Sequence, residues 1–359
     1  MVHGVLKNLK FNERLYAVYL LFPYCRTIGF IFSILFLNKI FVLGYQIHVT
    51  DYEIIKQLLS LKQFSSVFLI KDDRIEISFD NKNFFHISKQ LENIDKALIR
   101  LLDDGIKDGA IFIDEKNNTE IKHDKTIKII QSRKIVEVFE GIKFNLEQVG
   151  AMTEIFIRRI HESYSKDLNG KIVVDMGASV GDTPLYFASK GATVYAVEMT
   201  KTNFESMKKN IELNPHLSDK IIPIHLAFGK DGIIEYYQDA LDRVNYRGGA
   251  SFVKNKYGKY GKKNQVQGMS LNTFRKKYDL PSIDLLKIDC KGGEFFLKEE
   301  ELKNIKAVKI EYYSLKKEHK VSSLLDILGN NFNKIIFKHT PSDTSSFLKH
   351  GNILAYAKN

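Results

Sequence analysis

Residues 171–198 constrain the fold of this chain more than any other stretch, because they read as a strand, a glycine turn, a helix and a second strand in direct succession. Residues 172–174 are a short run of β-branched side chains, which is typical of a strand covered on both faces. Gly177 and Gly181 mark a tight turn in which a ligand can approach the backbone. Residues 194–197 form the next apolar strand. This order predicts the opening unit of a nucleotide-type α/β fold.

The acids and glycines of this unit distinguish between cofactors. Asp175 lies at the end of the first strand, and Glu198 ends the second, where an acid about 20 residues beyond the turn can bind ribose hydroxyls. The dinucleotide fingerprint GxGxxG needs three glycines, but its positions here hold Gly177, Ser179 and Asp182. Asp182 also places negative charge where a pyrophosphate needs positive potential. NAD and FAD are therefore disfavoured, and S-adenosylmethionine is favoured over an ordinary turn that binds nothing.

A second segment repeats this pattern further along the chain. Residues 283–288 form an apolar strand with Asp289 at its carboxyl end, and a Gly-Gly turn and a predicted helix starting at Glu294 follow. Residues 308–312 form a further strand that carries Glu311. In open α/β sheets, ligands bind at the carboxyl ends of the strands. The acids expected to meet at one rim are therefore Asp175, Glu198, Asp289 and Glu311.

The two segments resemble the FkbM-type family of S-adenosylmethionine-dependent methyltransferases. The similarity lies in VVDMGASVGDTPLYFA, VYAVE, TNFESMKKNIELN and LLKIDCKGGE, covers about residues 138–359, and is close to archaeal members. It implies an α/β class I methyltransferase fold, with a Rossmann-like seven-stranded sheet and an antiparallel C-terminal hairpin. Residues 334–339 and 353–357 would form that hairpin, and a helix over residues 147–164 would lie over the cofactor.

The resemblance also implies roles for individual residues. The residues expected to bind the cofactor are Asp175, Gly177, Ala178, Gly181, Asp182, Glu198, Ala227 and Phe228. Within this set, the glycine turn would line the methionine end, Glu198 would bind the ribose, and the Ala227-Phe228 pair would flank the adenine. Lys291 stands where the family usually has glutamate, and Met199 stands where relatives usually have proline. The lysine leaves open both an acid–base role at its position and the class of substrate.

The protein does not have to activate the methyl group for methyl transfer, because the sulfonium of S-adenosylmethionine already activates it. The protein must align the acceptor with the methyl group and exclude water, and a hydroxyl acceptor also needs a general base. Asp289 is the first catalytic candidate, followed by Glu294 and Glu311, although the latter two could be structural charges. Lys287 could bind an anionic acceptor or pair with an acid. No histidine spacing indicates a metal site, and a carboxylate-held Mg²⁺ at Asp289 stays open.

Two classes of function follow, the first with a variant. The first is O-methylation of a small-molecule or saccharide hydroxyl, which the resemblance implies. Its variant is methylation of RNA or another polyanion, favoured by a net charge of +11 and by the aromatic and basic residues of 239–264. Those residues could equally form a substrate lid or a solvated loop. The second class is a non-catalytic relic that binds the cofactor, which Lys291 favours.

The chain is expected to have three parts: an apolar N-terminal segment over residues 1–44, an α+β accessory domain over residues 45–140, and the methyltransferase domain over residues 141–359. The first part reads as helical, but Pro23 and Arg26 interrupt its apolar run at residues 15–37. Buried core helices, an interfacial membrane helix and a membrane span all remain open for it. A membrane surface is therefore a possible partner.

Neither Cys25 nor Cys290 has the spacing of a zinc site or of a disulfide framework. That fits a reducing compartment, so we expect a cytoplasmic protein with optional membrane association.

Local patterns predict the remaining elements. Helices are expected over residues 51–61, 94–102 and 203–214. Strands are expected over residues 67–70, 75–79, 84–87, 110–113, 120–122, 126–130, 134–139, 221–227 and 233–238.

Overall fold

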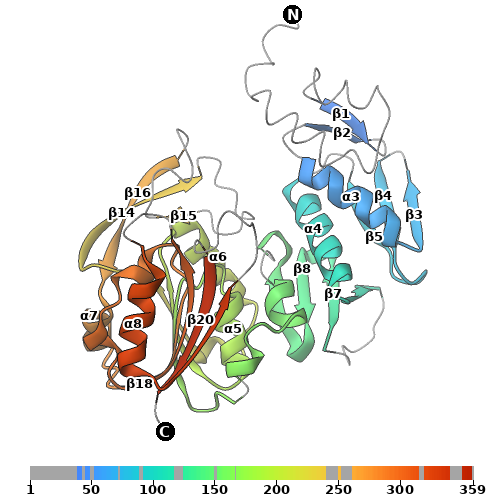
Figure 1. The fold of residues 1–359 in the computed structure, drawn as a ribbon. Coiled ribbons are helices and arrows are strands. Elements are labelled where there is room, and N and C mark those ends of the chain that lie inside the picture. The colour runs from blue at the N-terminus through green and yellow to red at the C-terminus, as the bar shows by residue number, and fades with distance from the viewer. Residues whose placement is uncertain are drawn as a thin grey trace, which may run out of the picture. The chain divides into compact units, whose positions relative to one another are not determined.

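The computed structural model (Figure 1) describes residues 39–42, 45–48, 52–71, 73–88, 92–116, 124–148, 152–165, 167–239, 250–251, 261–314, 319–339 and 350–357. The apolar residues 15–37 and most of residues 239–264 lie outside this part of the chain, so the predictions made for them stay predictions. The chain divides into two compact units, Met1–Arg158 and Arg159–Asn359, which are described separately. In the described residues, no helix is long and apolar enough to cross a membrane.

The first unit combines two helices with three small sheets in the part of it that is described. Its elements are β1 (Lys39–Val42), β2 (Tyr45–His48), α3 (Tyr52–Phe64), β3 (Val67–Ile70), β4 (Arg74–Ser78), β5 (Phe85–Ser88), α4 (Asn93–Lys107), β6 (Ile111–Asp114), β7 (Thr126–Ile130), β8 (Ile135–Val138) and β9 (Ile142–Asn145). The sheets have the orders β1-β2, β3-β4-β5 and β6-β7-β8-β9, and only β6 and β7 pair in parallel.

Most predicted elements of this unit are confirmed. Strands β2 and β9 were not predicted, and the predicted strand at residues 120–122 lies outside the described residues. Strand β1 occupies residues that were expected to belong to a helical segment. Its pairing with β2 in an antiparallel hairpin gives the backbone the partners that a helix would have supplied internally.

The helix predicted over residues 147–164 is wrong. The described part of this stretch holds only short turns: 3₁₀ turns at Leu146–Gln148 and Glu162–Tyr164, and one π turn at Thr153–Ile157. Arg159 has a φ of 53°, in the left-handed region, so a right-handed helix cannot continue through it. Amphipathic spacing alone did not reveal this break.

The second unit is built on a seven-stranded sheet with the order β12-β11-β10-β17-β18-β20-β19. Its strands are β10 (Ile172–Met176), β11 (Thr193–Glu198), β12 (Ile221–His225), β17 (Ile283–Ile288), β18 (Ile305–Tyr313), β19 (Lys334–His339) and β20 (His350–Tyr356). The first five strands of this order are parallel, whereas β20 runs antiparallel to both β18 and β19. The predicted class I methyltransferase fold with an antiparallel C-terminal hairpin is therefore confirmed.

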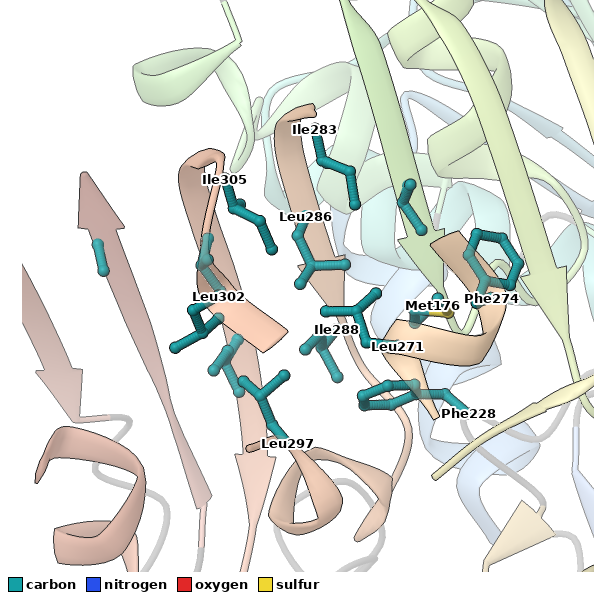
Figure 2. Close-up of a cluster of buried hydrophobic side chains, with 14 of the residues drawn as sticks. Met176, Phe228, Leu271, Phe274, Ile283, Leu286, Ile288, Leu297, Leu302 and Ile305 are labelled. Carbon is teal, nitrogen blue, oxygen red and sulfur yellow. The ribbon is translucent and has the colours of Figure 1, made fainter. Parts of the chain in front are cut away.

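A large hydrophobic core cluster packs against one face of this sheet, and Figure 2 shows part of it. Met176 of β10, Ile288 of β17 and Ile305 of β18 meet there with Leu271 and Phe274. The last two come from α7 (Leu271–Lys277), which, like α8 (Val321–Asn331), was not predicted. The helices that were predicted are α5 (Asp182–Ser189) and α6 (Lys201–Glu212).

A smaller sheet extends from the second unit with the order β13-β16-β14-β15. Its strands are β13 (Ala227–Phe228), β14 (Gly232–Asp239), β15 (Ala250–Ser251) and β16 (Gly261–Met269). The strand predicted over residues 233–238 is confirmed as β14. Strand β16 begins inside the predicted loop of residues 239–264, so that loop is shorter than expected.

Candidate active site

In the central strands of the main sheet, some ionisable side chains alternate with side chains of the hydrophobic core. In β18, Val308 and Ile310 belong to the core, and Lys309 between them points the other way because successive side chains alternate. Lys309 is in register with Lys287 of β17, which is in register with Asp175 of β10. A row of ionisable side chains therefore crosses the three central strands.

The glycine turn after β10 packs directly against the turn after β17. Gly177 has a φ of +93°, and a Cβ on it would lie 2.1 Å from the carbonyl oxygen of Asp289. The amide of Asp289 donates to the carbonyl of Met176 at 2.8 Å, and the amides of Gly177 and Ala178 both donate to Val197 at 2.9 Å. No larger residue fits at position 177, and the backbone there stays open to a close ligand.

The end of this turn is also shaped by a glycine. Gly181 has a φ of +91°, and a Cβ there would lie 3.0 Å from Cγ of Met207. Helix α5 starts at the next residue, Asp182, whose side chain is buried in the first turn. The predicted strand–turn–helix unit is thus present, with its acid at the helix start.

A buried ion pair lies under the glycine turn. Nζ of Lys287 donates to Oδ1 of Asp175 at 2.8 Å, and the exposed fractions of the two side chains are 9% and 0%. Burial alone would lower the pKa of Lys287, but the charges of Asp175 and Asp289 outweigh it and raise the pKa. The second carboxylate oxygen of Asp175, Oδ2, is buried without a hydrogen-bond partner among the described residues. A buried acceptor of this kind is costly unless a ligand supplies a donor.

Glu198 closes the far side of the turn. Its Oε2 accepts a hydrogen bond from the amide of Ser179 at 3.0 Å, and its Oε1 accepts from the amide and hydroxyl of Thr200, both at 2.8 Å. Burial raises the pKa of Glu198, and the hydrogen bonds from Thr200 and Ser179 lower it in part. Each carboxylate oxygen can accept two hydrogen bonds, so Oε2 keeps capacity for a ribose hydroxyl.

Glu294 lies inside the second turn and not at its surface. Its Oε2 accepts from the amide of Gly292 at 2.8 Å and its Oε1 accepts from the amide of Tyr313 at 2.7 Å, and the residue is fully buried. Burial raises the pKa of Glu294 to about 7. The carboxyl group therefore ties the turn after β17 to the end of β18. The predicted helix at this position is only a 3₁₀ turn over Gly293–Phe296.

Asp289 and Glu311 lie half-buried at the rim, each with a neighbour that holds it. Nζ of Lys291 donates to Oδ1 of Asp289 at 2.8 Å and lies 3.8 Å from the centre of the Tyr313 ring. The hydroxyl of Tyr313 donates to Oε1 of Glu311 at 2.5 Å. Burial, together with the charges of Asp289 and Glu311, raises the pKa of Tyr313. The rim thus presents carboxylate, ammonium and phenol groups together.

The residues predicted to flank adenine are placed differently from the others. Ala227 and Phe228 form strand β13, and both are buried, with exposed fractions of 0% and 2%. Figure 2 shows the ring of Phe228 among the core side chains beside Leu271 and Ile288. The side chain of Phe228 therefore packs in the core, and the expectation that the pair flanks the adenine stays a prediction.

Three further residues near the polar row were not predicted. Nδ1 of His161 contacts the hydroxyl of Tyr164, and the His161 ring packs against that of Phe187. Burial lowers the pKa of His161, helped by the charges of Lys287 and Lys309. The hydrophobic run that was taken for a helix hid His161 and Tyr164. The sequence did mark Lys309 as unusual, because it is a charged residue between two apolar residues of a strand.

Comparison with known families agrees with this geometry. Residues 175–336 match the family model of the methyltransferase FkbM domain. The chain contains an FkbM methyltransferase domain. It is an S-adenosylmethionine-dependent methyltransferase, as the resemblance of its motifs implied. No curated protein matches the chain.

Solved structures similar to this chain include several methyltransferases. The FkbM methyltransferase of Methylobacillus flagellatus KT is 13% identical, with a TM-score of 0.34, over 58% of this chain and 54% of its own. The METTL16 methyltransferase domain is 13% identical, with a TM-score of 0.36, over 86% of this chain and 92% of its own. Precorrin-6y C5,15-methyltransferase of Geobacter metallireducens GS-15 is 10% identical, with a TM-score of 0.33, over 56% of this chain and 88% of its own.

The residues of the FkbM domain fit its cofactor. Oδ2 of Asp175 can accept from an ammonium group, and the turn at Gly177 carries no side chain that would block the approach. Glu198 stands at the end of the neighbouring strand with hydrogen-bonding capacity left for a hydroxyl group. Acceptor groups for the ammonium group and for the ribose of an amino-acid nucleoside are therefore present at the carboxyl ends of β10 and β11.

Proposed function

We propose that the domain methylates a hydroxyl group of a small molecule or saccharide and holds the methyl donor between the turns after β10, β11 and β17. In this proposal Asp175, Gly177, Ala178, Gly181 and Asp182 surround the methionine end, and Glu198 binds the ribose. The buried, unpartnered Oδ2 of Asp175 carries the proposal, because a bound ammonium group would satisfy it. Bound S-adenosylmethionine supplies an activated methyl group, so the protein only has to align and desolvate the acceptor.

The proposed acceptor site is the rim next to the second turn. Asp289, Lys291, Glu311 and Tyr313 offer donors and acceptors within one half-buried group, as a hydroxyl-rich acceptor requires. Glu294 has a supporting role in this proposal, since both of its oxygens are engaged by backbone amides. Lys287 is likewise a partner of Asp175, and not a binder of the acceptor.

Isothermal calorimetry with S-adenosylmethionine and with its demethylated product tests the cofactor site. Wild type should bind both, and Glu198→Ala should bind about 10- to 100-fold more weakly, since a lost hydrogen bond to a charged group is worth roughly 1.5–3 kcal/mol. Glu205→Ala is the matched control, because Glu205 is a half-exposed acid on α6 paired only with Lys208 in the described residues. Circular dichroism must show that Glu198→Ala is folded, as Glu198 also holds two loops.

Absence of binding by wild type would refute the proposal at its first step. If wild type binds, radiolabelled methyl transfer to methyl glycosides, lipid extracts and RNA then tests the acceptor. Label in the glycosides is expected. Label in RNA alone would contradict the proposed acceptor but not the cofactor site.

A further inference from the structure

Lys309 is a second lysine in the polar row, half-buried and one strand away from the ion pair of Lys287 and Asp175. It lies on β18, which pairs with β17 on one side and with β20 on the other (Figure 1). Its register partner is Lys287, so the two ammonium groups project from the same face of the sheet. This position places Lys309 beside the proposed acceptor residues, since Glu311 follows it by two residues on the same strand and face.

The two lysines hold their protons very differently. Lys287 donates to the carboxylate of Asp175, which fixes its charge. Lys309 donates to the side-chain oxygen of Asn352, a neutral amide, and forms no ion pair with any residue that the structure describes. An ammonium group that is largely buried beside a neutral partner is poorly compensated, so it can lose its proton more readily than its neighbour.

The charges that act on Lys309 come from its own strand, from β17 and from the turn after β17. Burial lowers its pKa to about 8; Lys287 and Lys291 act in the same direction, whereas Glu311 and Asp289 oppose them. His161 also faces this group, but its own pKa is lowered and it is neutral in the same pH range. Lys309 is thus half deprotonated near pH 8, which suits a group that must accept a proton at physiological pH.

The carboxylates at and near the rim already accept hydrogen bonds from neighbouring groups. Asp289 is bound by Lys291, and Glu311 accepts from the hydroxyl of Tyr313. Both oxygens of Glu294 accept from backbone amides. In its neutral form, the amine of Lys309 still donates an N–H to the amide oxygen of Asn352. Its lone pair is not used in that hydrogen bond and can accept a proton.

We propose that Lys309 is the general base that removes the proton of the acceptor hydroxyl during methyl transfer, with Asn352 orienting its amine. The inference rests on the proposed function. The acceptor oxygen bonds to the methyl carbon while the bond from that carbon to sulfur breaks, and its electron pair stays on sulfur. The hydroxyl proton moves to the neutral amine of Lys309, which becomes an ammonium and later releases the proton to water.

The first test needs no acceptor. In protein labelled with carbon-13 at lysine Cε, one resonance should titrate near pH 8, and it should be missing from Lys309→Arg. It should remain in Lys306→Arg, which is the matched control because Lys306 lies on the same strand but is exposed and paired with Asp284 at 2.7 Å. If every lysine resonance titrates above pH 10, Lys309 keeps its proton and the proposal is wrong.

The second test follows methyl transfer to whichever methyl glycoside the acceptor screen identifies. In wild type, kcat should rise about tenfold per pH unit and level off above pH 8. Lys309→Arg keeps the positive charge and can still donate to Asn352, but arginine does not lose its proton at this pH. It should lower kcat by roughly 100- to 10,000-fold and remove the plateau, with little change in KM. Lys306→Arg should resemble wild type.

The arginine variant separates a base from an anchor. If Lys309 only bound the acceptor through its charge, Lys309→Arg would keep kcat and its pH profile, and this outcome would overturn the inference. Calorimetry with S-adenosylmethionine keeps the two proposals apart. If wild type does not bind S-adenosylmethionine, the proposed function is wrong. If the Lys309→Arg variant binds it normally and keeps its activity, only the role of Lys309 is wrong.

Discussion

Replacing Lys287 with methionine should destabilise the second unit by about 3–5 kcal/mol, the range for removing one partner of a buried ion pair. The structure supports the upper half of this range. Asp175 has no exposed surface, and its Oδ2 lacks a partner among the described residues even when Lys287 is present. Methionine fills the volume of the lysine stem but leaves the whole carboxylate buried without a donor.

Two comparison variants make this magnitude testable. Lys306→Met breaks an ion pair of similar length, 2.7 Å between Nζ and Oδ1 of Asp284, but Lys306 is 67% exposed. An exposed pair of this kind is worth only about 0–1 kcal/mol. The double variant Asp175→Asn with Lys287→Met removes both charges, so it should recover much of the stability lost in Lys287→Met alone.

The assay is urea unfolding followed by circular dichroism, since the chain contains no tryptophan. Folding raises the pKa of Lys287 above its ordinary value of 10.5, so the contribution of the pair is complete at neutral pH and is lost only as the pH rises beyond that value. A penalty in Lys287→Met that equals the penalty in Lys306→Met would refute this reasoning.

Two further outcomes follow from the turns. Gly177→Ala should abolish measurable binding of S-adenosylmethionine in calorimetry, because its Cβ would lie 2.1 Å from the carbonyl oxygen of Asp289. Gly232→Ala is the control, since Gly232 has a φ of +104° but no atom within 4 Å of an added Cβ. It should lose only about 1–2 kcal/mol of stability and keep binding. Folding raises the pKa of Glu294 from 4.5 to about 7, so its contribution is complete below pH 4.5 and is lost as the pH rises through 7. Wild type should therefore lose about 3 kcal/mol more than Glu294→Gln between these pH values, measured by urea unfolding; equal losses would contradict the assignment.

The central strands and turns were predictable because their signals are local. The apolar run of residues 283–288, closed by Asp289, coincides with β17, and the spacing of Gly177 and Gly181 matches two left-handed backbone positions. Parallel strands then bring their carboxyl ends together without further information. The rim of acids followed from topology alone.

Other features depended on tertiary contacts that no local pattern encodes. The pairing of β13 with β16 and the packing of the Phe228 ring in the core could not be predicted from the sequence around Phe228. The amphipathic spacing of residues 147–164 predicted a helix. The left-handed backbone at Arg159 interrupts it, and that feature has no signal in the spacing. Lys309 was overlooked because a charged residue in a strand usually marks an exposed face. Its burial depends on what packs over the sheet.

Lys291 forms an ion pair with Asp289 that bears on the proposed acceptor. Its ammonium group neutralises Asp289, just as Lys287 neutralises Asp175, so the two carboxylates beside the glycine turn are each balanced by a lysine of the same segment. Among the described residues, Lys287 and Lys291 are therefore both engaged by carboxylates. A polyanion would need free positive charge, since phosphate contacts supply most of its affinity. A neutral, hydroxyl-rich acceptor needs only paired donors and acceptors, which is the arrangement that Lys291 leaves in place.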